Sequence, residues 1–328
     1  MNLIFFSVPL WYGTDSIPSK SMNKPMNSVH VGLVGLGLMG RGIGLSLLRA
    51  GHPLHILPHK RRETAEELIA AGAQEAATPA ELGRRSDVVV SCLPSGEAVE
   101  HVLLGPSGIA RSDLAARPRS ESLLVIECST LTPEMGLALE SAVSEAGLAF
   151  VDAPLTRGPR EAVEGKLNAF VGGEPHAVER ATPVLRAFCE RVFSFGTAGS
   201  GYAAKLVNNF LAFSALVSVA EAIATADSAG LDQATLMEAI SVSGGQSRVL
   251  DGLAPVIAGS GSSRSIVTLA TANKDVAYYL DLARSLGTDG PVAHGVVERL
   301  STAIDAGLGD RLTPDYLGFI RDRKASRS

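Results

Sequence analysis

The sequence has few cysteines. Only three occur among 328 residues, Cys92, Cys128 and Cys189, and their spacing matches neither a zinc site nor a redox-active Cys-x-x-Cys pair. Three cysteines are also too few for a disulfide framework. We therefore expect reduced thiols, a cytoplasmic protein and no metal centre.

The sequence also lacks long runs of charge of one sign. Its formal net charge is −5, and the densest basic cluster is only HKRRE at 59–63. Nucleic-acid and membrane-surface binding normally require a larger basic patch. The apolar start, MNLIFFSVPLW, lacks the basic region and cleavage site of a signal peptide and is too short to span a bilayer. We expect no nucleic-acid partner, no membrane, and a flexible extension over residues 1–27.

What the sequence does contain is apolar residues, 46% of the total, which at this length suffices for two domains. After a first strand and helix starting at Val29, strands are expected at 52–57, 87–93, 123–129 and 149–154. Strands that alternate with helices predict an α/β fold with a doubly wound parallel sheet. After Gly173 a helix at about 175–190 and a short apolar segment at 191–196 are expected. Helices follow at about 202–228, 232–242, 248–257, 271–286 and 291–307, so the second half is expected to be all-helical. The predicted domains are 28–196 and 197–328.

Three glycines, Gly35, Gly37 and Gly40, have the spacing G-x-G-x-x-G. This triplet alone is a weak signal, because glycine turns are often structural. Here it lies between an apolar strand and an apolar helix, where backbone amides at the helix N-terminus can hold a pyrophosphate. The turn, with Leu38 and Met39 inside it, therefore predicts a dinucleotide-binding site.

Polar and turn-forming residues follow two later strands, in SCLPSGEAV and ECSTLTPE. Leu93, Pro94, Ser129 and Thr130 are thereby placed at the carboxyl ends of parallel strands, where open sheets of this kind bind ligands. Each residue alone is also consistent with an ordinary turn or helix cap. Their recurrence at one edge favours a cofactor cleft.

The residues after the second strand bear on the choice of cofactor. Sites that select NAD usually carry an acidic residue about 20 residues after the glycine turn. Here the chain reads ILPHKRRE, so that Pro58 is followed by His59, Lys60, Arg61 and Arg62. Positive charge there would bind a 2′-phosphate, which predicts NADP in preference to NAD. The alternative is an exposed basic start of a helix.

The segment GSGYAAKLVNNFL contains an unusual lysine. Lys205 is the only charged residue between Tyr202 and Ala220, and a helix that is apolar on nearly every face is expected to be buried. Burial of an unpaired ammonium is costly. Lys205, Asn208 and Asn209 have helical spacing that places them on one face. A helix N-terminus and desolvation both favour the neutral amine, which makes the ammonium a ready proton donor. The alternative is a lysine that extends to solvent from the first turn.

Four blocks together resemble the beta-hydroxyacid dehydrogenase family. They are GLVGLGLMG, VDAPLTRGP with EGKLNAFVGG, GSGYAAKLVNNFL and NKDVAYYLDLA, which are spread from about Val29 to about Val292. The resemblance implies an N-terminal Rossmann domain joined by a long interdomain helix to an all-helical C-terminal domain. It also implies an NAD(P)-dependent oxidoreductase that interconverts a small β-hydroxy acid and its semialdehyde, usually as a dimer or tetramer.

The resemblance assigns roles to individual residues. The family's catalytic lysine falls on Lys205, its partner asparagine on Asn209, and the lysine that closes over the cofactor on Lys274. Its substrate-binding loop falls on 152–158. Asp152 at the start of this loop is better explained as a side chain that binds backbone amides.

The substrate loop departs from the family pattern. Most members read D-A-P-V-S-G-G where this chain reads DAPLTRGP, so that Thr156 keeps a hydroxyl and Arg157 replaces a glycine. Arginine suits a carboxylate, sulfonate or phosphate, and sulfolactaldehyde reductases are similar in having an arginine in this loop. The expected substrate therefore carries a second anionic group. The alternative is that Arg157 pairs with Glu161 or Glu164, or points to solvent. The predicted substrate contacts are Thr156, Arg157, Gly158 and Asn208.

Two other classes of protein remain open from the sequence. A sensor or scaffold that binds NADP without catalysis would keep the same fold. Imine reductases resemble the family closely but, as a family, have another residue at the lysine position. The presence of Lys205 disfavours both classes.

Overall fold

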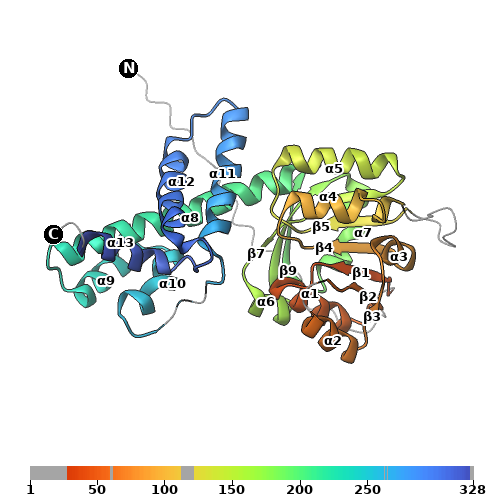
Figure 1. Cartoon of the computed structure of the whole chain (residues 1–328), viewed down its shortest axis with the longest axis horizontal. Helices are drawn as coiled ribbons and strands as arrows, with labels where there is room; N and C mark the ends of the chain where they lie inside the picture. Colours follow the sequence, from red (N-terminus) through yellow and green to blue (C-terminus); the bar gives the residue numbers. More distant parts are fainter. Residues whose placement is uncertain (1–27, 60–61, 112–121, 262, 264, 326–328) are drawn as a thin grey trace, which may run out of the picture.

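The computed structural model describes residues 28–59, 62–111, 122–261, 263 and 265–325. A sheet covered by helices forms one part of the molecule and a group of helices forms the other. The long helix α8 (Ser200–Ser228) runs from the first part into the second (Figure 1). The predicted extension, residues 1–27, lies outside the described residues.

The N-terminal part is built on one nine-stranded sheet in the order β3-β2-β1-β4-β5-β6-β8-β7, with β9 paired to β8. Strands β1 to β6 run parallel, and β8 is antiparallel to β6. The strands are β1 (Val31–Val34), β2 (Leu54–Leu57), β3 (Gln74–Glu75), β4 (Val88–Ser91), β5 (Leu124–Glu127), β6 (Ala149–Asp152), β7 (Leu155–Thr156), β8 (Leu167–Gly173) and β9 (Cys189–Gly196). The central strands β1, β4 and β5 are buried throughout, as expected for strands covered on both faces.

Helices cover both faces of the sheet, which confirms the doubly wound α/β fold. Along β4, Val88 and Val90 belong to one hydrophobic cluster and Val89 to the other, because side chains alternate along a strand. The first cluster includes residues of α1 (Leu38–Arg49), α2 (Arg62–Ala70), α6 (Pro159–Glu164) and α7 (Pro175–Leu185). The second includes residues of α3 (Pro79–Arg85), α4 (Gly96–Leu104) and α5 (Pro133–Glu145).

The C-terminal part is helical, as predicted; the described residues there add one isolated β-bridge, between Thr268 and Leu312. Its core joins Leu216 and Ile223 of α8 to residues of the later helices such as Leu253 and Val276. These helices are α9 (Gln233–Ser241), α10 (Arg248–Ile257), α11 (Leu269–Ser285), α12 (Pro291–Ala303) and α13 (Asp315–Ala325), with a π-helical turn at Ile304–Leu308.

The expectation that α8 is buried on nearly every face is wrong for the isolated chain. Val207 is 46% exposed and Leu211 is 62% exposed. The sheet covers the start of α8 and the later helices cover its end, so one outer face has no neighbour in the described chain. By length and composition alone α8 would also suffice to cross a membrane, a test that core helices of soluble proteins pass as well.

The segment before α8 also differs from the prediction. The helix expected at 175–190 ends at Leu185, because the amides of Arg186, Ala187 and Phe188 turn back onto carbonyls of its last turn. The chain then enters β9 at Cys189, which pairs with the unpredicted strand β8. This pairing is between distant segments, which local sequence patterns do not encode.

A buried carboxylate fixes the start of α8. Asp152, at the end of β6, accepts hydrogen bonds from the amides of Gly199 at 2.8 Å and Tyr202 at 3.1 Å. A Cβ atom at Gly201 would lie 2.5 Å from Asp152 Oδ2, so the close approach requires glycine there. Asp152 therefore binds backbone amides, as the sequence suggested.

Removal of this carboxylate should destabilise the protein more than removal of an exposed cap. Asp152→Ala leaves two buried amides without an acceptor, and we expect a loss of roughly 2–4 kcal/mol in the free energy of unfolding, measured by urea titration. Asp152→Asn, which keeps an acceptor oxygen, should lose less. The control is Asp232→Ala, which removes the exposed cap of α9. Equal losses at both positions would contradict the anchoring role.

Candidate active site

The glycine turn has the geometry of a dinucleotide-binding loop. Gly35 has a φ of +89°, and a Cβ atom there would lie 2.0 Å from the carbonyl oxygen of Cys92. A Cβ at Gly40 would lie 1.8 Å from the Gly35 carbonyl oxygen, whereas one at Gly37 would meet nothing within 4 Å. The turn is thus tight at two positions and open at Gly37, and α1 begins at Leu38 with unsatisfied amides. These residues fit a pyrophosphate at the helix N-terminus.

The predicted residues at the next two strand ends lie together beside this turn. The amide of Leu93 donates to Ser129 Oγ at 2.8 Å, and the amide of Ser129 donates to Glu127 Oε1 at 2.6 Å. Because β1, β4 and β5 are adjacent and parallel, Gly35, Leu93 and Ser129 form one edge of the sheet. We call this edge, with Met39, Pro94 and Thr130, the cofactor rim.

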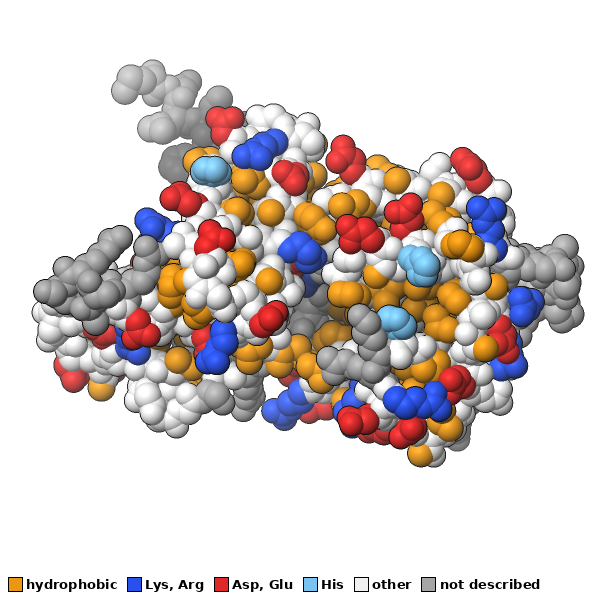
Figure 2. Space-filling model, viewed as in Figure 1, with side chains coloured by type: hydrophobic (Ala, Val, Ile, Leu, Met, Phe, Trp, Pro, Cys, Tyr) orange, Lys and Arg blue, Asp and Glu red, His pale blue; other side chains and the backbone are white. Residues whose placement is uncertain are grey.

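The basic residues after β2 are only partly described. Arg62 begins α2 and forms ion pairs with Glu75 at 2.8 Å and Glu66 at 3.5 Å. Acidic and basic side chains alternate over this region of the surface (Figure 2). His59 is exposed, and Lys60 and Arg61 lie outside the described residues. Contact of this cluster with a 2′-phosphate stays a prediction.

The side chain of Lys205 reaches from α8 to Leu155 of β7 in the sheet. Its Nζ atom donates a hydrogen bond to the carbonyl oxygen of Leu155 at 2.6 Å. Burial lowers the pKa of Lys205; nearby Asp275 opposes this shift and Lys274 adds to it. The side chain therefore does not extend to solvent, and its neutral form is more accessible than that of a free lysine.

A chain of polar contacts supports this face of α8. Asn208 Nδ2 donates to Asn209 Oδ1 at 3.1 Å, and Asn209 Nδ2 donates to Asp275 Oδ2 at 2.7 Å. Asp275 in turn pairs with Lys274 at 2.9 Å. Asn209 thus holds Asp275 rather than Lys205 itself. The sequence placed Asp275 beside Lys274 in the block NKDV but indicated no role for it.

Lys274 connects the helical part to the cofactor rim through a hydrogen bond. It lies on α11, and its Nζ atom donates to the carbonyl oxygen of Thr130 at 3.3 Å. The same atom lies 4.7 Å from the centre of the Tyr278 ring. With Lys205 bonded to Leu155, two lysines therefore cross from the helical part to the ends of the strands.

Thr156 lies opposite Asn168 in the pairing of β7 with β8. Asn168 Nδ2 donates to Thr156 Oγ1 at 3.3 Å. The threonine hydroxyl acts as acceptor in this contact, which leaves its hydrogen available to a substrate oxygen. Gly158 follows as the N-terminal cap of α6.

Arg157 has partners inside the protein. Its Nη2 atom pairs with Glu190 of β9 at 2.7 Å, and Nη1 donates to the Lys166 carbonyl. The sequence had suggested Glu161 or Glu164 as alternative partners, and the acid found is a third one. Arg157 also has a φ of +76°, a backbone conformation that favours the glycine it replaces. A role for Arg157 in substrate binding stays a prediction.

A second residue missed in the sequence is Glu127, which is completely buried. Burial raises the pKa of Glu127 to about 7, although its hydrogen bonds to Ser129 act to lower it. Ser91 lies beside it on the same face of the sheet. The Ser91 hydroxyl also favours the ionised form of Glu127. Tyr202 Oη has no hydrogen-bond partner among the described residues. The block ECST contained the acid, but its burial depends on helices that pack over the sheet.

The described residues contain no group of three or more His, Cys, Asp or Glu side chains arranged to bind a metal ion. The described residues do offer a desolvated lysine bonded to Leu155 and a glycine turn that fits a pyrophosphate. This combination of fold and site defines an NAD(P)-dependent oxidoreductase.

Two family models match the chain and cover both parts of it. Residues 30–196 match the NAD-binding domain of 6-phosphogluconate dehydrogenase. Residues 199–316 match the NAD-binding domain of NADP-dependent 3-hydroxyisobutyrate dehydrogenase.

Individual proteins match over most of their length. L-threonate dehydrogenase of Cupriavidus necator is 33% identical over 86% of this chain and 93% of its own. 3-Sulfolactaldehyde reductase of Escherichia coli K12 is 30% identical over 85% of this chain and 91% of its own. The structure of Mycobacterium tuberculosis 3-hydroxyisobutyrate dehydrogenase with L-serine superposes with a TM-score of 0.78 at 25% identity, and covers 90% of this chain and 99% of that one.

The chain belongs to the beta-hydroxyacid dehydrogenase family. Its relatives act as dehydrogenases or reductases on hydroxyl groups and their carbonyl counterparts, and it shares their NAD(P)-binding domains. An imine reductase of Myxococcus stipitatus is more distant, with a TM-score of 0.60 at 18% identity over 89% of this chain and 99% of its own, and shares the fold alone.

The buried acid in the cofactor rim should make stability depend on pH. The folded protein holds the Glu127 proton up to about pH 7, whereas the unfolded chain releases it near the usual pKa of 4.5. The stability of the wild type should therefore fall as pH rises through this range. Glu127→Gln removes the titration, so its unfolding free energy relative to wild type should increase between pH 5 and pH 8 by on the order of 1–3 kcal/mol.

Urea titrations at both pH values measure this difference. The control is Glu134→Gln, which changes an exposed acid of α5 and should leave the pH dependence unchanged. A Glu127→Gln difference that is the same at pH 5 and pH 8 would show that Glu127 is ionised throughout.

Proposed function

We propose that the protein interconverts a small β-hydroxy acid and its semialdehyde by hydride transfer, with Lys205 as the general acid and base. The observation that carries this proposal is the placement of Lys205, whose ammonium donates a hydrogen bond to Leu155 of the sheet and whose pKa is lowered by burial. We propose further that the protein is cytoplasmic and forms a homodimer or homotetramer.

In this reaction each residue would have a distinct catalytic, binding or positioning role. When bound, the nicotinamide ring gives or takes the hydride. In reduction, Lys205 Nζ donates a proton to the carbonyl oxygen of the substrate, and in oxidation the neutral amine accepts the hydroxyl proton. Thr156 would donate a hydrogen bond to the substrate carboxylate, and Asn208 and Gly158 are the other proposed substrate contacts. Asn209 keeps the face of α8 in position through its bond to Asp275.

Substitution of the two central residues should separate their roles. Lys205→Met removes the proton donor and should lower kcat by about a hundred- to ten-thousandfold, whereas Asn209→Ala should cost less. Cofactor dissociation constants, measured by fluorescence of the reduced dinucleotide, should stay near the wild-type value in both variants. A folded Lys205→Met enzyme that keeps most of its turnover would remove Lys205 from the mechanism.

The basic cluster after β2 supports a preference for NADP. We expect a higher kcat/KM with NADPH than with NADH, because His59, Lys60, Arg61 and Arg62 would surround a 2′-phosphate. Arg61→Ala and Arg62→Ala should each raise the KM for NADPH and leave that for NADH unchanged. Arg186→Ala, at an exposed site at the end of α7, is the charge-matched control. A higher efficiency with NADH would refute the preference.

We also propose that the substrate carries a second anionic group. Arg157 is a candidate to bind it, but it would have to exchange Glu190 for the substrate. The 3-sulfolactaldehyde reductase similar to this chain is named for a substrate with such a group.

Two alternatives are tested by the same assays. Turnover of a semialdehyde with NADPH would exclude a sensor or scaffold that only binds NADP. Loss of that turnover in Lys205→Met would disfavour an imine reductase, since that family has another residue at this position.

A further inference from the structure

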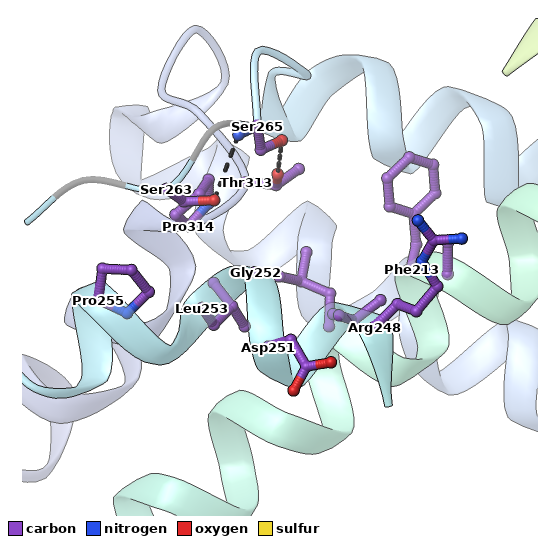
Figure 3. A pocket seen from close by; sticks show the side chains of 13 residues that line it. Phe213, Arg248, Asp251, Gly252, Leu253, Pro255, Ser263, Ser265, Thr313 and Pro314 are labelled. Carbon is purple, nitrogen blue, oxygen red and sulfur yellow. Dashed lines mark hydrogen bonds between the residues drawn. The ribbon is translucent and has the colours of Figure 1, made fainter. Parts of the chain in front are cut away.

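A cavity of about 690 Å³ lies in the helical part (Figure 3). Phe213 and Leu216 of α8 and Leu253 of α10 give it apolar walls. Residues just before α11 and α13, among them Ser265 and Thr313, line another side, and their hydroxyl groups bond to each other at 2.8 Å. The cavity is thus largely apolar, and these two hydroxyl groups are already bonded to each other.

The cavity continues the face of α8 that carries the proposed active site. Lys205, Asn209 and Phe213 are spaced by four residues and therefore project from one side of the helix. At 1.5 Å per residue, Phe213 lies about 12 Å beyond Lys205 along the axis. Ala212, which also lines the cavity, follows Asn208 by one turn. The reacting centre and the cavity are therefore neighbouring stretches of one surface.

Arg248 brings a positive charge to this cavity. It is an exposed lining residue and forms no ion pair or hydrogen bond with any residue that the structure describes. It begins α10, where a cation is unfavourable because of the helix dipole, so helix stability does not explain it. In Figure 3 its guanidinium lies at the same end of the cavity as Phe213.

The acid in the cavity does not neutralise Arg248. Asp251 Oδ2 accepts a hydrogen bond from Gln246 Nε2 at 2.9 Å. Its carboxylate points away from the Arg248 guanidinium (Figure 3). Arg157 differs in this respect, because Glu190 already holds its guanidinium.

We propose that Arg248 binds a second anionic group of the substrate, whose tail extends from the reacting carbon at Lys205 along α8 into this cavity. The inference rests on the proposed function, because it needs a substrate whose reacting carbon lies at Lys205. The apolar walls fit a methylene chain, and the guanidinium fork fits a terminal carboxylate or sulfonate. Substrates with a longer anionic tail should therefore be preferred to those with a short alkyl group.

A comparison of two substrates tests the contribution of the anionic tail alone. 3-Hydroxyisobutyrate and 2-(hydroxymethyl)glutarate share the hydroxymethyl group and the first carboxylate. At the same carbon the former carries a methyl group and the latter a carboxyethyl group. We expect Arg248→Met to lower kcat/KM for 2-(hydroxymethyl)glutarate by about 10- to 100-fold, as for loss of a charge-assisted hydrogen bond, and to leave 3-hydroxyisobutyrate within about twofold. The loss should appear mainly in KM, because Arg248 does not touch the reacting atoms.

Three further variants sharpen the comparison. Arg248→Lys should recover part of the loss, and Arg186→Met should have no effect on either substrate. Arg157→Gly should change both substrates equally if Arg248 binds the tail. Calorimetric binding of glutarate to the enzyme with NADP should weaken in Arg248→Met and not in Arg186→Met.

The outcomes separate the inference from the proposed function. Equal losses on both substrates in Arg248→Met, or a selective loss in Arg157→Gly instead, would overturn the role of Arg248 and leave the oxidoreductase activity intact. Wild-type enzyme that is active on 3-hydroxyisobutyrate but not on 2-(hydroxymethyl)glutarate would also overturn it. Wild-type enzyme that turns over no hydroxy acid or semialdehyde would instead refute the proposed function.

Discussion

The contact between the Asp152 carboxylate and the first amides of α8 sets how α8, and with it Lys205, sits against the sheet. Gly199 and Tyr202 bind to it from the helix side, and its own position is fixed as the last residue of β6. A helix N-terminus favours such an anion, so the sheet and the helix hold each other in one orientation. Lys205 follows within the next turn and therefore reaches Leu155.

Desolvation shifts the pKa values of Lys205 and Glu127 in opposite directions. Burial lowers the pKa of Lys205, an ammonium, and raises that of Glu127, a carboxyl, because in each case it disfavours the charged form. The lysine thereby becomes a better proton donor. The acid, closed off behind the cofactor rim, instead accepts the Ser129 amide and orders the loop that follows β5.

The two arginines near the site show why a charged residue in a promising motif is not yet a binding residue. Arg157 lies in the substrate loop, but β9 places Glu190 against it. Arg248 lies outside the recognised motifs, yet the packing of α10 against α8 leaves it at a cavity where no acid among the described residues pairs with it. In both cases a neighbour from a distant part of the chain decides how much of the charge is available.

The sequence by itself determined the alternation of strands and helices, the glycine turn and the shared face of Lys205, Asn208 and Asn209, because each depends on spacing within a few residues. Only the tertiary structure decided the ends of α7 and β9, the burial of Glu127, the Asn209 to Asp275 contact and the partner of Arg157. These features depend on which distant segments pack together. Strand pairing, helix contacts and desolvation arise between such segments, and the spacing of residues within a short stretch of sequence does not encode them.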